Sequence, residues 1–278
     1  MLAPRQIIFT AVDGILDRVS ADSTDAASDA LQMLARKGVP LVLYTRRTRA
    51  ELDSLRRKLQ HGHPFLTEGG AGLFIPDGYF NLHLEGAARI GRNFCVPFAR
   101  SHEEAAAALP EIAEEAGAGV VGFSQMSIRD IARNVGMASR DAELYRQREF
   151  GEIFFFAGQT EKATRRFLEV AGRKGWEALP GDPFWELRGA LKQNGGNAVR
   201  YLMGVYRKSL HGRQRSIGIG SDAGDLPLLL STDTAVLLPG PSGGLDDALL
   251  SRLPRAAQVE QRGGAGWAEA VARALEKP

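Results

Sequence analysis

Runs of consecutive apolar residues alternate with amphipathic stretches in the first and last thirds of the chain. The run over 7–12 leads directly into Asp13 and Gly14, which is typical of a buried parallel strand that ends in a tight turn. Positions 22–37 carry alanines and leucines at helical spacing, and a second apolar run follows over 39–45. This alternation predicts an α/β fold with a mostly parallel sheet, in which chemistry lies at the carboxyl ends of the strands.

The pattern changes after about residue 91, where short strands and helices of more mixed polarity begin. We expect helices at 103–117, 126–135, 141–147 and 161–172, and strands at 119–123, 154–156 and 176–179. A second α/β domain is therefore inserted between two halves of the first. The predicted division is 1–90 and 184–278 for the core and 91–183 for the insertion.

Charge and cysteine content narrow the classes of function. The chain has 278 residues and a formal net charge of only +2, so no strong global field favours nucleic acid or an anionic membrane. Basic runs at 46–49, 56–58 and 207–215 fit either solvated surfaces or a rim that attracts phosphate. The single cysteine, Cys95, excludes an internal disulfide and suits a reducing compartment. No apolar segment reads as a leader or a membrane span, so we expect a cytoplasmic protein.

The first strand and its turn resemble the opening motif of the haloacid-dehalogenase-like (HAD) phosphatases. That motif is an apolar strand followed by Asp, any residue, Asp, Gly and Thr. Asp13 and Gly14 match its second half, whereas Ala11 stands in place of the first Asp and Ile15 in place of the Thr. Thr45 at the end of the next strand matches the second motif, a hydroxyl that hydrogen-bonds a substrate phosphate.

The stretches 45–52 and 64–76 together resemble the mannosyl-3-phosphoglycerate phosphatases within that superfamily. Those proteins have a Thr-Arg-Ala-Glu helix, then Pro-Phe, a Glu-Asn-Gly-Gly turn and Ile-Pro. The turn appears here as Glu68, Gly69, Gly70 and Ala71. A tight hairpin would explain the same glycines without any ligand.

Two stretches of the insertion, 122–127 and 147–152, resemble the cap of the same family. The resemblance implies a Rossmann-like HAD core with an inserted α/β cap of the second class (C2B). In the family an Arg-Glu pair lies at the cap face that covers the substrate, and Arg148 and Glu149 are the matching positions. A surface ion pair of small energetic value is the alternative.

The last two motifs return in the C-terminal part of the chain. The catalytic Lys of the family falls on Gly195, in a stretch that opens a helix. In the fourth motif the first of two acids is replaced by Ser221 and the second is kept as Asp225. Asp222 lies one residue late, so its carboxylate should point elsewhere unless the loop is shifted. The final helix over 264–275 also matches the family.

The resemblance implies a catalytic role for each motif residue, and these replacements remove several of the residues that would fill those roles. In the family one Asp attacks phosphorus, a second acts as general acid and base, and a Lys and magnesium hold the charge. Ala11, Gly195 and Ser221 leave the nucleophile, the Lys and one metal ligand vacant, while Asp13 keeps the acid/base position. We expect the remaining phosphate or substrate contacts and metal ligands at the following positions: Thr45, Arg46, Glu68, Gly70, Arg148 and Glu149 for substrate, and Asp13, Ser221, Asp222 and Asp225 for a weak or absent Mg²⁺.

Three functions are open at this point. The first is a catalytically dead or severely impaired phosphatase homologue, kept to bind a phosphorylated sugar acid or to regulate. The second is an active phosphatase with a rewired site, in which Asp13 activates water and Asp222 and Asp225 hold magnesium. The third is a scaffold for a glycosyltransferase of the same pathway.

Overall fold

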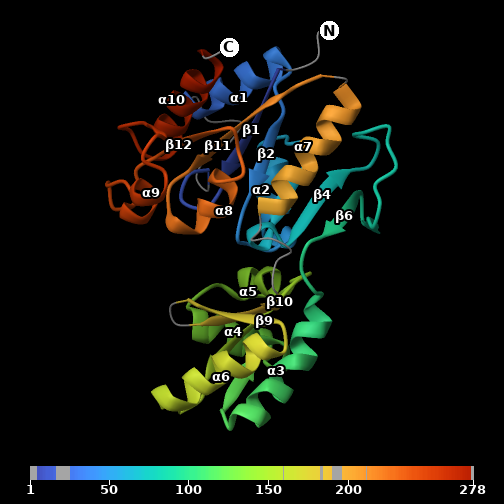
Figure 1. Cartoon of the computed structure of the whole chain (residues 1–278), viewed down its shortest axis with the longest axis vertical. Helices are drawn as coiled ribbons and strands as arrows, with labels where there is room; N and C mark the ends of the chain where they lie inside the picture. The colour runs from blue at the N-terminus through green and yellow to red at the C-terminus, as the bar shows by residue number, and fades with distance from the viewer. Residues whose placement is uncertain are drawn as a thin grey trace. The chain divides into compact units, whose positions relative to one another are not determined.

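The computed structural model describes residues 5–16, 26–158, 160–181, 184–189, 196–210 and 212–276. The chain forms two compact units, each with its own sheet (Figure 1). The first consists of Met1–Arg46, Leu52–Val96 and Gln193–Pro278, and the second of Arg47–Glu51 and Pro97–Lys192. The sequence-based boundaries near 91 and 183 stay predictions.

The first unit is built on a nine-stranded sheet of order β13-β12-β11-β1-β2-β3-β4-β6-β5. The strands are β1 (Gln6–Ala11), β2 (Leu41–Tyr44), β3 (Phe65–Thr67), β4 (Gly72–Pro76), β5 (Ala88–Ile90), β6 (Asn93–Pro97), β11 (Arg215–Gly220), β12 (Thr234–Leu237) and β13 (Ala257–Gln258). Neighbours from β13 through β3 run parallel, and β4 and β5 pair antiparallel to β3 and β6. The expected α/β fold with a mostly parallel sheet is confirmed.

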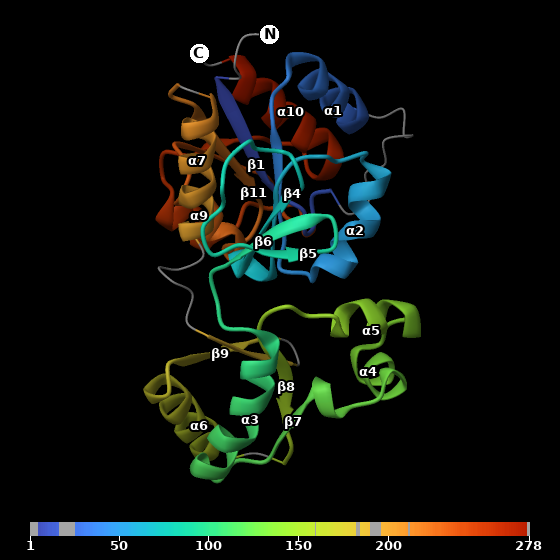
Figure 2. The same cartoon turned by 90° about the vertical axis from the view of Figure 1, so that its right-hand side faces the viewer.

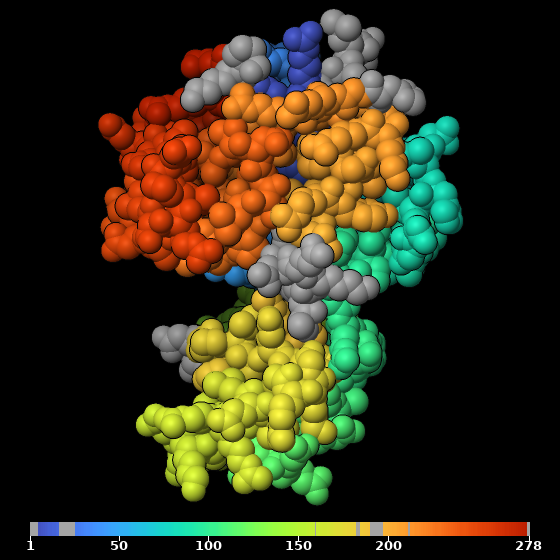
Figure 3. All heavy atoms as spheres, in the orientation of Figure 1, coloured from blue at the N-terminus to red at the C-terminus, as the bar shows by residue number. Residues whose placement is uncertain are grey.

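Helices cover both faces of this sheet. They are α1 (Ala26–Lys37), α2 (Arg49–Lys58), α7 (Gly196–Leu210), α8 (Leu226–Leu229), α9 (Asp247–Arg252) and α10 (Gly263–Glu276). Figures 1 and 2 together place α7 on one face and α1 and α2 on the other. Figure 3 shows that α7 and the segments after it form most of the visible face of this unit. The helix expected over 22–37 is present from Ala26, and residues 22–25 lie outside the described residues.

The central strand is buried on both sides, as its continuous apolar run predicts. Ile7, Ile8 and Phe9 have no exposed surface, and the fully buried Trp267 of α10 donates its indole N–H to the hydroxyl of Thr10 at 3.0 Å. Burying a polar hydroxyl in such a core is tolerated only when it is hydrogen-bonded. This contact therefore fixes the last helix against the strand that leads to the site.

A short 3₁₀ turn, η1 (Glu68–Gly70), joins β3 to β4 in a hairpin. Its three residues have φ of 49°, 66° and 90°, in the left-handed region that favours glycine. The hairpin interpretation therefore accounts for Gly69 and Gly70 through backbone conformation alone.

The second unit has a four-stranded antiparallel sheet of order β7-β8-β10-β9. Its elements are α3 (His102–Ala116), β7 (Val120–Gly122), η2 (Phe123–Gln125), α4 (Ile128–Val135), α5 (Ser139–Arg146), β8 (Glu152–Phe156), α6 (Glu161–Arg173), β9 (Trp176–Pro180) and β10 (Trp185–Gly189). One core packs α3 and α6 on the sheet around Phe154 and Phe167, and a smaller one packs α4 and α5 around Phe123 and Ile131. Sequence reasoning found these elements except η2 and β10.

Within the part of the chain that the structure describes, no helix is both long and apolar enough to cross a bilayer.

Candidate functional site

Asp13 lies just beyond the carboxyl end of β1 and is held by the end of β2. Thr45, which is fully buried, donates its hydroxyl to both carboxylate oxygens of Asp13, at 2.9 and 3.1 Å. The backbone N–H of Arg46 donates to Oδ2 of Asp13 at 2.9 Å. The structure thus brings together the residues that the sequence placed at the ends of these two strands, and the Thr45 hydroxyl and the Arg46 N–H both hold the Asp13 carboxylate.

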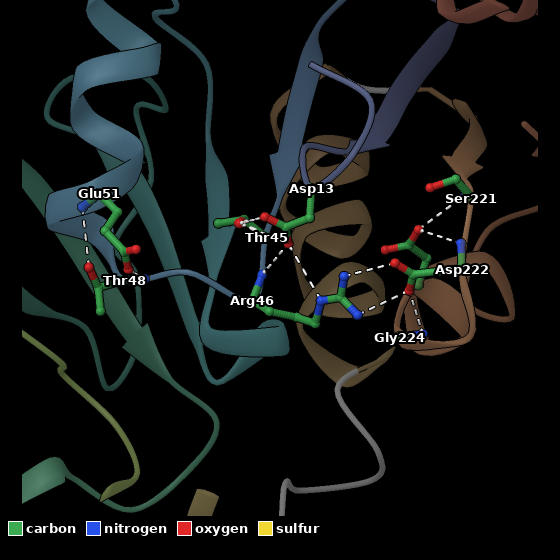
Figure 4. Close-up of polar contacts among 9 residues, drawn as sticks. Asp13, Thr45, Arg46, Thr48, Glu51, Ser221, Asp222 and Gly224 are labelled. Carbon is green, nitrogen blue, oxygen red and sulfur yellow. Dashed lines mark hydrogen bonds and ion pairs between the residues drawn. The ribbon is translucent and has the colours of Figure 1, made fainter. Parts of the chain in front are cut away.

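The side chain of Arg46 extends from the same position to the loop after β11 (Figure 4). Its two terminal nitrogens donate to the two oxygens of Asp222 at 3.0 and 2.8 Å, and its Nε lies 3.6 Å from Oδ2 of Asp13. Partial burial lowers the pKa of Arg46, but the carboxylates of Asp222, Asp13 and Asp225 outweigh it and raise the pKa above its ordinary value. The guanidinium therefore stays charged and links two carboxylates that come from distant parts of the chain.

Asp225 is the internal anchor of the loop. It is 1% exposed, and its Oδ2 accepts the backbone N–H groups of Ser221 and Asp222 at 2.8 and 3.2 Å. Burial and the neighbouring charge of Asp222 raise the pKa of Asp225 to about 7, although those two N–H groups and Arg46 lower it. Asp225 thus serves first as a cap for its own loop, where it also closes the short turn η3 (Ala223–Asp225).

The glycine at position 224 leaves room for the Arg46 guanidinium. A Cβ built there would lie 2.9 Å from Cζ of Arg46 and closer still to its Nη1. The N–H of Gly224 also donates to Oδ1 of Asp222 at 2.7 Å. Sequence reasoning missed this residue, because nothing in the local pattern shows which side chain approaches it.

The structure describes two of the three positions at which the sequence lacks the residue of the family motif. Ala11 is the last residue of β1, pairs with Tyr44 of β2 and is fully buried, so a methyl group lies at the strand end. Ser221 is 3% exposed at the start of the loop after β11. Gly195 lies outside the described residues.

The two residues expected in the η1 turn are buried. Glu68 is 2% exposed with φ of 49°, and Gly70 has φ of 90°. The N–H of Gly69 donates to the carbonyl of Thr45 at 3.0 Å, so the turn is tied to the end of β2. Their role in binding a substrate stays a prediction.

Arg148 and Glu149 lie in the second unit and form separate ion pairs within it. Arg148 is 5% exposed and binds Glu186 at 2.8 Å and the carbonyl of Phe150 at 3.1 Å. Glu149 accepts from Nε of Arg49 at 2.7 Å. Sequence reasoning missed the partners Arg49 and Glu186. The pairs are partly buried rather than superficial, and a part in substrate binding stays a prediction.

No family model matches the chain, whereas curated proteins match it along nearly its whole length. A glucosyl-3-phosphoglycerate/mannosyl-3-phosphoglycerate phosphatase of Methanococcoides burtonii is 31% identical over 267 residues, which is 96% of each chain. A mannosyl-3-phosphoglycerate phosphatase of Pyrococcus horikoshii is 24% identical over 84% of this chain and 90% of that protein.

The chain belongs to the mannosyl-3-phosphoglycerate phosphatase family. Solved structures agree on the fold of this family member. A phosphatase of the HAD superfamily from Bacteroides thetaiotaomicron superposes with a TM-score of 0.65 at 15% identity over 98% of this chain and 96% of that one. A HAD subclass IIB sugar phosphatase gives 0.57 at 15% identity, with 98% of both chains covered. The family member therefore has the HAD core and cap architecture that its motifs imply.

Proposed function

We propose that this member of the family binds a phosphorylated sugar acid and hydrolyses it very slowly or not at all. The observation that carries the proposal is the fully buried methyl group of Ala11 at the end of β1, where the family motif has its nucleophilic Asp. A methyl group cannot form a phosphoenzyme, and covalent catalysis requires a nucleophilic side chain. The relatives' names supply the ligand class, since they are phosphatases of glucosyl- and mannosyl-3-phosphoglycerate.

The neighbouring polar groups support impaired chemistry as well. Both oxygens of Asp13 accept hydrogen bonds, and the Arg46 guanidinium lies 3.6 Å away, so neighbouring groups of the protein already occupy this carboxylate. The hydrolysis of phosphate monoesters needs an acceleration of up to about 10²¹-fold. Positioning alone leaves only a small residual rate when a nucleophile is missing.

Arg46 is the residue that we expect to contact the ligand's phosphate or carboxylate. Its side chain is 47% exposed, and a planar guanidinium binds such anions through two parallel hydrogen bonds. In the structure this fork is taken by Asp222, so an incoming anion would compete with that carboxylate.

Calorimetry with mannosyl-3-phosphoglycerate, 3-phosphoglycerate and mannose 1-phosphate tests the binding. We expect heat of binding for at least one of them, lost in Arg46→Gln and kept in Arg57→Gln, which removes the same charge from the exposed side of α2. Absence of binding to all three would refute the proposal.

A phosphate-release assay at high protein concentration separates this function from that of a rewired phosphatase. We expect no release above that of an Asp13→Asn variant. Release that depends on Asp13 would instead establish the active, rewired site and remove the proposal of a non-hydrolysing protein.

A further inference from the structure

The Arg46 guanidinium lies among the carboxylates that the family motif would offer to a metal ion. It makes two hydrogen bonds to Asp222 and lies 3.6 Å from Asp13, and the charge of Asp225 acts on it as well. These residues come from the ends of β1, β2 and β11, which meet at one edge of the sheet (Figure 4). The positive charge of Arg46 thus reduces the repulsion among the carboxylates of this acidic cluster.

We propose that the Arg46 side chain replaces the divalent cation of this site, so that the protein holds its acidic cluster together without a metal. This inference is independent of any ligand, because it concerns only the balance of charge in the unliganded protein. The proposed binding of a sugar acid can fail while the metal-independence holds, and the reverse is equally possible.

The donor set does not fit magnesium. Mg²⁺ requires near-octahedral oxygen coordination, usually through one or two carboxylates with free lone pairs. Both oxygens of Asp222 accept from Arg46, and the Oδ2 of Asp225 accepts two backbone N–H groups. Ser221 offers only a hydroxyl where the family has an acid. Among the residues that the structure describes, no group of three His, Cys, Asp or Glu side chains is placed to hold a metal ion.

The space for the guanidinium is a second, independent observation. A Cβ at position 224 would overlap the terminal atoms of Arg46, so any other residue there would require the guanidinium to shift from this position. Gly224 does not have a positive φ, so its backbone does not require glycine. The space left by this glycine is therefore the space that the guanidinium occupies.

The order of residues in the loop fits the same conclusion. The family's acid position holds Ser221, and the carboxylate has moved one residue on, to Asp222. That shift directs the carboxylate toward the guanidinium, where a fork of two N–H groups matches two oxygens (Figure 4). The chain has lost an acid suited to a metal and has an acid suited to an arginine.

Binding of Mn²⁺ followed by electron paramagnetic resonance tests the proposal on the unmodified protein. We expect the free-ion spectrum at millimolar Mn²⁺ with the wild type, and at least about tenfold tighter binding with Arg46→Gln. Tenfold is a conservative estimate for removing a unit charge a few ångströms from the ion in a partly solvated site. Arg57→Gln is the matched control and should bind no more Mn²⁺ than the wild type.

Thermal unfolding with and without Mg²⁺ supplies the second readout. Arg46→Gln should unfold at a lower temperature than the wild type and regain stability when Mg²⁺ is added, because the ion then binds only the folded state. Arg46→Lys keeps the charge and should gain no response to Mg²⁺. Submillimolar binding of Mn²⁺ by the wild type would overturn the proposal, as would an Arg46→Gln variant that folds but gains no metal binding.

Discussion

Restoring the missing carboxylate by Ala11→Asp is expected to destabilise the protein without restoring hydrolysis. Ala11 is completely buried, and the carboxyl group of Asp13 lies two residues away in the sequence. Burial and a nearby like charge both raise the pKa of a carboxyl group. A rise of about 2–3 pKa units corresponds to about 3–4 kcal/mol of lost stability at neutral pH.

The pH dependence of stability distinguishes the effect of the new side chain's charge from the effect of its size. Because the folded-state pKa of the new carboxyl is raised, its penalty is absent below its unfolded pKa of about 4, grows as the pH rises from there toward the folded value, and is complete above it. Ala11→Asn introduces nearly the same volume with no charge, so its loss of stability should not depend on pH in this way. At about 2–4 °C per kcal/mol, the charge should lower the melting temperature of Ala11→Asp by about 6–16 °C relative to Ala11→Asn at pH 7 and hardly at all at pH 4.

Calorimetric or fluorescence melts of both variants from pH 4 to pH 8 provide the measurement, together with a phosphate-release assay. We expect no gain of hydrolysis, because Ser221 and Arg46 still leave the site without a metal ion. If Ala11→Asp were as stable as Ala11→Asn at pH 7 and hydrolysed mannosyl-3-phosphoglycerate, a single methyl group would be the only defect. The inference about Arg46 would then be wrong.

Three further predictions concern the fold around the site. Trp267→Phe should lower the free energy of unfolding by about 2–3 kcal/mol in denaturant titrations, because it removes a buried hydrogen bond and leaves a small cavity. Gly220→Ala should cost about 1–3 kcal/mol, since its Cβ would lie 2.8 Å from Cβ of Asp225, whereas Gly204→Ala in α7, with open space around it, should be neutral or stabilising by up to about 1 kcal/mol. Equal losses for the two glycine variants would contradict the steric argument. Burial lowers the pKa of His61 to about 3, so the protein should lose stability as the pH falls from 6.5 toward 3, by at most about 1.4 kcal/mol per unit. His61→Gln should remove that part of the slope, and an unchanged slope would refute its origin in His61.

The strands β1 and β2 could be predicted because they are nearly continuous apolar runs. Ile7, Ile8 and Phe9 are fully buried, and the polar Thr10 that follows them is tolerated because its hydroxyl accepts the indole N–H of Trp267. The strand β10 could not be found in this way, because Glu186 and Arg188 interrupt its apolar positions. In the second unit Glu186 forms an ion pair with Arg148, and Arg188 forms one with Glu177. Charged residues that indicate a loop in the sequence are therefore paired with opposite charges in the strand.

The candidate site was predictable only as far as its positions along the strands. Asp13 and Thr45 each follow an apolar run, and parallel strands bring such ends together. The contact between Arg46 and Asp222 joins residues 176 positions apart, and the direction of the Asp222 carboxylate depends on the conformation of its loop. The sequence therefore indicated where the family motif is not matched, but not that Arg46 lies between Asp13 and Asp222.

Arg46, Asp222 and Gly224 make physical sense only as a set. An arginine without the shifted acid would place an unmatched positive charge beside a metal site and weaken metal binding. The shifted acid without the arginine would add a carboxylate next to Asp225, whose pKa is already raised to about 7 by burial and by Asp222 itself. A larger residue at 224 would displace the guanidinium from its present position in either case. Ser221, Asp222 and the ion pair with Arg46 therefore fit the proposal made above, in which a side chain fixed in the fold supplies the positive charge that an exchangeable ion would otherwise bring.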